Sequence, residues 1–192
     1  GVFYMAIPPT VFLKTARALG DSGMISCDDR PFWTRAVIEK PFGRDRSSSD
    51  ELAAGLAQVF NERQTYRIDH YLGKEVVQNL LALRFANLVF EPVWNRHYID
   101  RVDVIWQENI GTEGRGGYFD EFGIIRDVVQ NHLLQILALV AMERPNALTA
   151  HAVRDEKVRV LEAIPPVTLE DTLLGQYTRG ESPGGGAQPG YR

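Results

Sequence analysis

The first 60 residues alternate between short apolar runs and helical patterns, and this alternation constrains the fold more than any other feature of the chain. Strand, helix, strand and helix in succession are typical of a βαβ unit. Such a unit requires a parallel sheet, because two parallel strands need a crossover connection between them. The four predicted segments are residues 2–7, 11–19, 36–38 and 48–60.

Local signals mark the ends of these segments. Pro8 and Pro9 end the first strand, because proline cannot donate to a strand ladder. Thr10 is a suitable cap for the first helix. Ser48 and Glu51 have capping-box spacing at the start of the second.

The pattern changes near residue 70, beyond which long helices and isolated strands replace the regular alternation. We expect the sheet of this second part to be incomplete within the chain, and the overall class to be α/β followed by α+β. The predicted segments are a polar loop at 64–73, a helix at 74–87, a strand at 102–106, a glycine-rich loop at 111–117, helices at 122–142 and 155–163, and the start of a strand at 169–177.

Charge and cysteine content narrow the possible functions. The 21 Lys and Arg against 25 Asp and Glu give a net charge of −4, which does not indicate a nucleic-acid surface. The single cysteine, Cys27, excludes an internal disulfide and any multi-cysteine metal site, and we expect no bound metal. No uninterrupted apolar run approaches the roughly 18 residues of a membrane span. The chain starts without Met, inside an apolar run, so we expect the natural start to lie upstream.

Lys40 is the first candidate for a functional role. Ligands bind beyond the carboxyl ends of the strands in open parallel sheets, and both predicted strands of the first part end in proline there. Lys40 would therefore face a cofactor or an anionic substrate, and the Lys40–Pro41 bond is a candidate for the cis form. The alternative is a solvated lysine before a turn.

The segment from Asp69 to Lys74 is a candidate phosphate site. It leads into a predicted helix N-terminus, where free N–H groups and partial positive charge attract phosphate. His70, Tyr71 and Lys74 add side-chain donors, and Gly73 allows close approach of the backbone. The alternative is that these rings pack on the helix and the lysine is solvated.

His132 is the candidate general base. It lies in a predicted helix that is polar in its first half and apolar in its second, which would suit the wall of a pocket. Asp127 is five residues away, about 140° around an α-helix, so the two cannot pair squarely. We expect Asp69 to orient the imidazole instead. The alternative is a satisfied core histidine.

The glycine-rich loop does not indicate nucleotide binding. Phe119 stands where a G-x-G-x-x-G motif would need its third glycine, and neither that motif nor a P-loop occurs in the chain. Glu108 ends the preceding predicted strand and could reach a pocket. His97 and His151 are predicted in polar loops and receive no role.

Four segments in order resemble the glucose-6-phosphate dehydrogenase family. Arg67–Lys74, with the sequence RIDHYLGK, is similar to the active-site signature of that family, and Arg126–His132 is similar to the segment that carries its catalytic histidine. Glu39–Gly43 and Gly111–Asp120 are similar to two further blocks. The likeness extends from about residue 2 to 177.

The resemblance implies oxidation of glucose 6-phosphate at C1 to 6-phosphogluconolactone, with hydride transfer to NADP, the first step of the oxidative pentose phosphate pathway. It implies that His132 is the base and Asp69 its carboxylate partner. The substrate contacts that it implies are Lys40, His70, Tyr71, Lys74, Glu108 and Asp127. The coenzyme contacts that it implies are Lys40, Pro8, Phe12 and Pro41.

The resemblance also implies a domain division. Residues 1–68 would be the C-terminal part of a Rossmann-like dinucleotide-binding domain. Residues 69–192 would be the first part of an α+β substrate and dimerisation domain with a mainly antiparallel sheet. The glycine-rich coenzyme fingerprint of the family would lie upstream, so we expect the 192 residues alone to be inactive. We expect a homodimer or homotetramer at full length, in the cytoplasm or in a plastid.

The chain departs from the family pattern at a few positions. Phe12 replaces a frequent tyrosine, and Asn109-Ile110 replaces a Pro-Phe pair. Two other functions stay open: a sugar-phosphate isomerase that uses His132 with the same phosphate site, and a catalytically dead homologue with a regulatory role.

Overall fold

A computed structural model describes residues 1–26, 33–108, 111–112, 114–176, 178–181 and 187–188 of the chain. Backbone contacts divide the chain into two compact units, Gly1–His70 and Tyr71–Arg192. Cys27 lies outside the described residues. Each unit has its own hydrophobic core.

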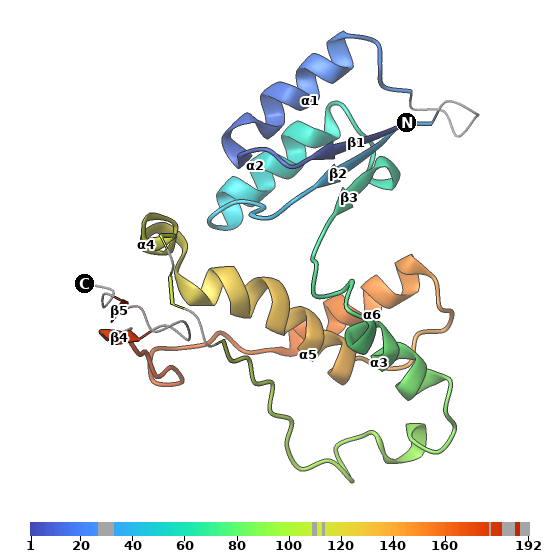
Figure 1. Ribbon diagram of the computed structural model, residues 1–192. Helices are drawn as coiled ribbons and strands as arrows, with labels where there is room; N and C mark the ends of the chain where they lie inside the picture. The colour runs from blue at the N-terminus through green and yellow to red at the C-terminus, as the bar shows by residue number, and fades with distance from the viewer. Residues whose placement is uncertain (27–32, 109–110, 113, 177, 182–186, 189–192) are drawn as a thin grey trace. The chain divides into compact units, whose positions relative to one another are not determined.

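The first unit is a three-stranded parallel sheet covered by two helices (Figure 1). The strands, in the order β1-β2-β3, are β1 (Val2–Met5), β2 (Arg35–Ile38) and β3 (Thr65–Arg67), and the helices are α1 (Phe12–Asp21) and α2 (Arg46–Ala57). Short 3-10 turns, Pro9–Val11 and Glu62–Gln64, precede α1 and β3. Both crossovers run in the same direction across the sheet, so α1 and α2 cover the same face and contact each other.

The predicted βαβ unit is confirmed, with three local corrections. Thr10 lies inside a 3-10 turn and does not cap α1, whose N-cap is Val11. Asp45, not Ser48, is the N-cap of α2, because its carboxylate accepts the Ser48 N–H at 2.8 Å and Ser48 completes the capping box. The third strand, β3, falls in the predicted polar loop, since its sequence Thr-Tyr-Arg has no apolar alternation.

The core of the first unit is apolar. Strand and helix side chains pack between the sheet and the helices, and Phe12, Ala16, Ala36 and Ile38 have no exposed surface. Gly55 of α2 lies so close to α1 that an added Cβ would stand 2.6 Å from Leu13. The helix pair is therefore held at a distance that a side chain at position 55 would disturb.

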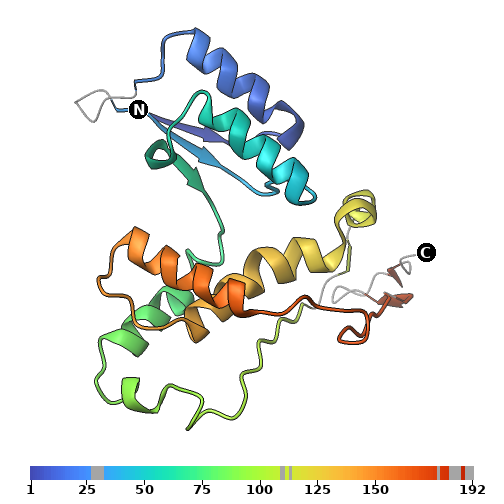
Figure 2. The same cartoon turned by 180° about the vertical axis from the view of Figure 1, so that it is seen from behind.

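The second unit is mainly helical (Figure 2). Its helices are α3 (Glu75–Phe85), α4 (Gly116–Ile124), a π-helical stretch from Ile125 to Leu133, α5 (Leu134–Ala141) and α6 (Ala150–Ala163), with a 3-10 turn at Glu91–Val93. α5 packs against α3 and α6 around the buried side chains of Val77, Phe85, Leu139 and Met142. The predicted helices at 74–87 and 122–142 are confirmed.

Two predicted strands of the second unit are wrong. Residues 102–106 are extended, but within the described part of the chain no strand pairs with them. At 169–171 the backbone instead turns, with the Asp171 carboxylate accepting the Thr168 N–H at 2.9 Å, and residues 172–176 have no regular secondary structure. Tyr177, the end of that prediction, lies outside the described residues. The sheet that is described consists of β4 (Gly180–Glu181) and β5 (Ala187–Gln188), paired antiparallel.

The final helix begins earlier than predicted. Thr149 caps α6 by accepting the Ala152 N–H at 3.3 Å, so His151 lies in the helix and not in a loop. The Asp155 carboxylate is 3.3 Å from the Nδ1 atom of His151. Both side chains are exposed, and this pair contributes little to stability.

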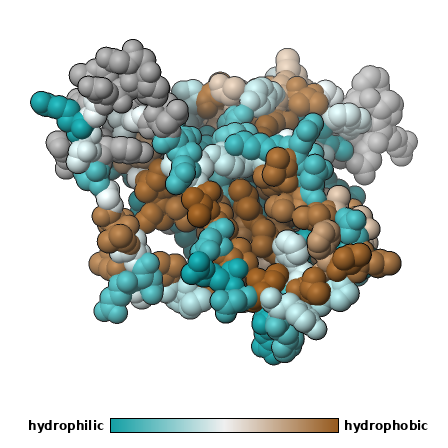
Figure 3. All heavy atoms as spheres, turned by 60° about the horizontal axis from the view of Figure 1, so that its bottom comes forward, coloured by the Kyte–Doolittle hydropathy of each residue, from teal (hydrophilic) through white to brown (hydrophobic). Residues whose placement is uncertain are grey.

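The second unit exposes many large apolar side chains, and Figure 3 shows apolar residues gathered on one face. Val76, Leu88 and Val89 are each 79% exposed. By length and composition alone the helical stretch Gly116–Ala141 could cross a membrane, which the sequence analysis did not expect. Core helices of globular domains meet the same criterion. This stretch is interrupted by Gly123, which has a φ of 66°, and it buries Asp127 and His132.

Candidate active site

The carboxyl ends of β1 and β2 position the predicted coenzyme residues of the first unit. Because Met5 pairs with Ile38, Pro8 and Lys40 follow the two strands at the same edge of the sheet. Pro8 is exposed, and Lys40 and Pro41 are partly exposed. The Lys40–Pro41 bond is cis, as the sequence analysis considered.

The loop after Lys40 is held tightly against α2. Gly43 has a φ of 104°, and a Cβ there would lie 2.6 Å from the backbone nitrogen of Ser49. The Ser48 hydroxyl accepts the N–H groups of Arg44 at 2.9 Å and Asp45 at 3.1 Å. Only glycine fits position 43, so the Glu39–Gly43 block fixes the backbone that carries Lys40.

Phe12 does not have the position expected of a coenzyme contact. Its ring is fully buried in the core of the first unit, whereas the neighbouring Pro8 is exposed. In this conformation Phe12 packs the start of α1 and presents no surface to a ligand. A tyrosine hydroxyl at this position would be buried and would need a hydrogen-bond partner, so phenylalanine suits this position.

The signature segment continues from strand β3. The Ile68 N–H donates to the Ile38 carbonyl at 3.0 Å, which extends the ladder one residue beyond β3. Arg67 forms a two-pronged ion pair with Glu62, with Nη1 2.9 Å from Oε1 and Nη2 3.2 Å from Oε2. Arg67 therefore stabilises the strand end, while Asp69, partly buried, and His70, exposed, follow it.

Tyr71 is the centre of a cluster in the second unit. Its ring stacks on the His132 imidazole, with ring centroids 4.2 Å apart and planes inclined by 15°. The Lys74 Nζ lies 3.7 Å from the centroid of the same ring. The Trp106 indole N–H donates to the Tyr71 hydroxyl at 2.7 Å. Three segments of the unit thus meet at one phenol: the loop before α3, the segment around Trp106 and the π-helical stretch.

At the start of α3, side-chain donors are better placed to bind an anion than backbone N–H groups are. Lys74 is the N-cap, with no side-chain capping bond, and Glu75 in the first turn is acidic. The Lys74 N–H already donates to the Tyr71 carbonyl at 3.1 Å, and the Val77 N–H donates to the Lys74 carbonyl at 3.0 Å. Two of the amides that a phosphate could use are therefore engaged within the turn.

His132 and Asp127 lie on the π-helical stretch, where Leu134 donates to the carbonyl of Val129, five residues earlier. The angle of about 140° between Asp127 and His132, which was expected for an α-helix, therefore does not apply. A π-turn takes more residues than an α-turn, so positions five apart lie closer to the same face of the helix. Both side chains are buried, with 2% of His132 and 7% of Asp127 exposed. Isolated π-turns are frequent at functional sites.

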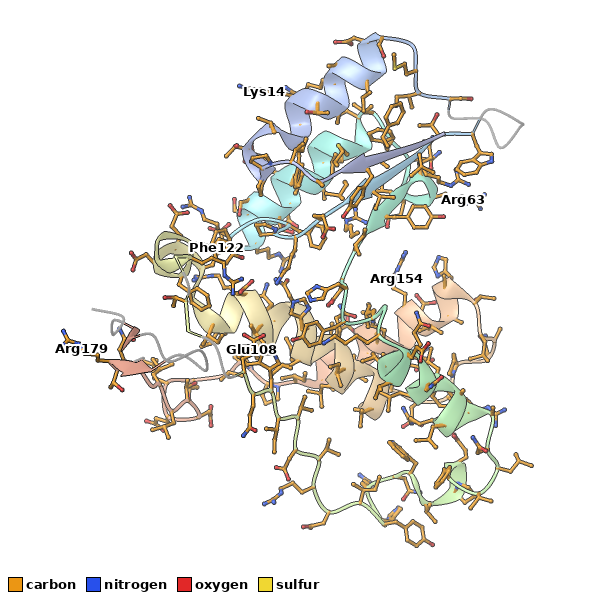
Figure 4. All side chains as sticks on the ribbon, in the orientation of Figure 1. Lys14, Arg63, Glu108, Phe122, Arg154 and Arg179 are labelled. Carbon is orange, nitrogen blue, oxygen red and sulfur yellow. The ribbon has the colours of Figure 1, made fainter. Side chains whose placement is uncertain are left out.

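Asp127 has a partner that the sequence analysis missed. The Tyr118 hydroxyl donates to Asp127 Oδ1 at 3.0 Å, and the Tyr118 ring stacks on Phe122 with centroids 4.6 Å apart. Burial, the Asp127 charge and this hydrogen bond raise the pKa of Tyr118 to about 12, against a lowering influence of Arg115. Phe122, labelled in Figure 4, thus helps to hold the phenol that orients Asp127.

Glu108, labelled in Figure 4, lies on the extended segment before α4, and its side chain is exposed. The structure brings Tyr71, Lys74 and His132 together and orients Asp127 on the same helix as His132. Lys40, Asp69 and His70 belong to the first unit, so their predicted pairing with residues of the second stays a prediction. Trp106 was missed as a contributor, since the pattern at 102–106 indicated only a strand.

Comparison with known families accounts for the whole chain. Residues 1–79 match the family described as "Glucose-6-phosphate dehydrogenase, NAD binding domain", and residues 81–192 match "Glucose-6-phosphate dehydrogenase, C-terminal domain". The two matches change over at residue 80, within α3.

Individual relatives agree. The chain is 54% identical over 190 residues to glucose-6-phosphate 1-dehydrogenase 1, chloroplastic, of Arabidopsis thaliana, covering 99% of this chain and 32% of the relative. It is 54% identical over 176 residues to the cytoplasmic isoform of Solanum tuberosum, covering 92% of this chain and 34% of the relative. The chain therefore spans about a third of the length of these curated relatives.

Solved structures are also similar. A glucose-6-phosphate dehydrogenase in complex with its substrate glucose-6-phosphate has a TM-score of 0.85 and 48% identity, covering 99% of this chain and 38% of that one. The enzyme from Mycobacterium avium has a TM-score of 0.83 and 40% identity, covering 92% and 37%. On both sequence and structure, this chain belongs to the glucose-6-phosphate dehydrogenase family.

Proposed function

We propose that the protein containing this chain oxidises glucose 6-phosphate to 6-phosphogluconolactone and transfers the hydride to NADP. The observation that carries the proposal is the cluster of His132, Tyr71 and Lys74, in which a buried imidazole stacks on a phenol that also contacts an ammonium group. It offers a base and phosphate donors side by side, as a sugar phosphate requires. The names of the relatives, and the glucose-6-phosphate bound to one similar enzyme of known structure, support the same reaction.

His132 is proposed to remove the proton of the C1 hydroxyl. An imidazole that is only 2% exposed needs a carboxylate to fix its tautomer and to stabilise the imidazolium that forms. Asp69 is proposed for that role. NADP would accept the hydride that leaves C1 as the proton is removed.

The other side chains would hold the sugar. Asp127, oriented by Tyr118, and Glu108 are proposed to bind sugar hydroxyls. His70, Tyr71 and Lys74 are proposed to bind the phosphate, where a charged ammonium and a phenol are both suitable donors. This division assigns the C1 hydroxyl to His132 and the phosphate to the neighbouring donors.

The residues at the sheet edge fit one border of a coenzyme site. Lys40 supplies a cation next to a turn that only glycine fits at position 43, Pro8 supplies exposed apolar surface, and Pro41 supplies partly exposed apolar surface. Phe12 would act indirectly, by packing the start of α1 in the core of the first unit. The chain has no G-x-G-x-x-G motif to cradle the pyrophosphate, so we expect the 192 residues alone to bind NADP weakly and to be inactive.

We further propose residues 1–68 as the end of a dinucleotide-binding domain and residues 69–192 as the start of an α+β domain. That second domain would build a mainly antiparallel sheet. At full length we propose a homodimer or homotetramer that binds neither nucleic acid nor membranes. We propose a cytoplasmic location, with a plastid as the alternative, because the relatives include both isoforms.

The proposal is tested on the full-length protein with glucose 6-phosphate and NADP, by the absorbance of the reduced nicotinamide. His132→Asn should lower kcat by about 10²- to 10⁴-fold, the usual contribution of a general base, and leave substrate affinity within a few-fold. His97→Asn is the matched control, because His97 is exposed and has no proposed role.

Three outcomes would contradict the proposal. Conversion of the substrate to fructose 6-phosphate without NADP reduction would identify an isomerase. Tight substrate binding without turnover would identify a catalytically dead homologue. Wild-type turnover in His132→Asn would exclude His132 as the base.

A further inference from the structure

The hydrogen bond from Trp106 to Tyr71 joins two segments that no backbone pairing connects. Trp106 lies on the extended segment 101–108, which belongs to no sheet in the described part of the chain. Its indole Nε1 is 2.7 Å from the Tyr71 hydroxyl, and both side chains are partly buried. A side chain, not a strand ladder, therefore fixes this segment to the cluster around Tyr71.

The chemistry of the two groups sets the direction of this bond. An indole N–H can only donate, so the phenol oxygen must be the acceptor. A phenol that accepts one hydrogen bond keeps its own proton for a different direction. Trp106 therefore holds Tyr71 as a donor, which is the role that an oxygen-rich anion requires.

We propose that Trp106 is a positioning residue for the substrate phosphate, acting by holding the Tyr71 hydroxyl as a donor toward it. The inference rests on the proposed function and extends it to a residue without a direct role in the chemistry. Tyr71 has two further contacts in the same unit, the stack with His132 and the Lys74 ammonium at 3.7 Å. Loss of the Trp106 hydrogen bond would leave the Tyr71 hydroxyl free to rotate. The ring of Tyr71 also contacts His132 and Lys74, which are both proposed to act on the substrate.

The test uses Trp106→Phe in the full-length enzyme, because phenylalanine keeps an aromatic ring and removes the donor. The KM for glucose 6-phosphate should rise about three- to tenfold, the effect of one lost hydrogen bond, with a smaller change in kcat. Glucose has the same C1 hydroxyl but no phosphate. The ratio of kcat/KM for glucose 6-phosphate to that for glucose should therefore fall by about the same factor.

A double-mutant cycle with Tyr71→Phe separates positioning from general damage. Once the Tyr71 hydroxyl is absent, Trp106→Phe should have little further effect on the KM, because the two groups act through one bond. Trp94→Phe is the matched control: it also removes an indole donor of this unit, the one that binds the Val140 carbonyl at 2.8 Å. It should lower stability without changing the ratio between the two substrates.

Equal losses on both substrates, an unchanged KM or additive effects in the cycle would each overturn the inference. If the wild-type protein does not oxidise glucose 6-phosphate, the proposed function fails instead. Calorimetric binding of glucose 6-phosphate to wild-type and Trp106→Phe protein then still tests Trp106. Weaker binding to the variant would support the positioning role, and equal binding would refute it.

Discussion

The two units of the chain are held together in different ways. In the first unit, distant segments are joined by backbone bonds of the parallel ladder and by an apolar core around Phe12 and Ile38. In the second, several segments are joined by single side-chain hydrogen bonds. Arg84 donates to the Leu139 carbonyl, and Trp94 donates to the Val140 carbonyl, each at 2.8 Å.

This difference predicts which contacts tolerate substitution and which do not. An apolar core tolerates many sequences if volume and pattern are kept. A buried polar contact requires one donor at one place, and a missing partner leaves the other group unsatisfied. The first unit also has such contacts, since the buried Gln64 side chain donates to the Ser26 carbonyl at 2.8 Å and to the Thr34 carbonyl at 3.0 Å. There they add to a strand ladder, whereas in the second unit they join described segments that no ladder connects. Removing a buried polar donor should therefore cost more stability in the second unit.

The largest effect is expected in the first unit. Phe12→Ala removes a fully buried ring and should lower the free energy of unfolding by about 3–5 kcal/mol. Hydrogen exchange of the full-length protein should show faster exchange in β1, β2 and β3 and little change in α5. Val11→Ala is the control, since Val11 is 36% exposed. Equal acceleration in α5 would mean that the two units do not unfold separately.

An intermediate effect is expected from Arg84→Met in the second unit. Methionine keeps most of the packing, but the Leu139 carbonyl at the end of α5 loses its donor, which should destabilise the protein by about 1–3 kcal/mol. Burial lowers the pKa of Arg84 against the raising influence of Glu91 and Glu143. Arg96→Met, at an exposed position, should change stability by less than about 0.5 kcal/mol.

Denaturant unfolding and exchange in α5 and α3 measure this effect. A more stable Arg84→Met protein would break the comparison, because it would mean that the desolvation of the guanidinium outweighs its hydrogen bond. The guanidinium also lies 4.6 Å from the Phe85 ring and 5.1 Å from the Trp94 ring. Part of its contribution is therefore packing that methionine retains.

The same contrast explains how much could be predicted from the sequence. The βαβ order follows from apolar periodicity and proline stops, and the structure confirms it. β3 was missed because Thr65-Tyr66-Arg67 pairs through its backbone, with no apolar pattern of its own. The strand at 102–106 was wrong because alternation alone does not provide a neighbour to pair with.

The candidate site shows a similar limit. The structure brings Tyr71, Lys74 and His132 together, and the roles that the motifs indicated for them stay predictions. Trp106 could not be found, because its contact with Tyr71 spans 35 positions and depends on one indole atom. The π-helical turns were also missed, since the residues that form them have an ordinary helical pattern. Contacts set by tertiary packing have no local signal.

The smallest effect concerns the pair of Tyr118 and Asp127, a polar contact of the second unit that titrates. The folded pKa of Tyr118, about 12, is above its ordinary value of 10.0. A raised pKa means that the folded protein holds the proton more tightly than the unfolded chain. The stability from this group is thus fully present below pH 10.0 and is lost as the pH rises through about 12.

Tyr118→Phe removes this dependence. Unfolding measured across that alkaline range should show a steeper loss of stability in the wild-type protein than in the variant. Tyr98→Phe is the control, because Tyr98 is 71% exposed. The effect should be modest, since Tyr118 is only partly buried and solvent screens its interaction with Asp127. Identical alkaline profiles would mean that the bond to Asp127 does not persist in solution, and that Asp127 is oriented by other groups of the second unit.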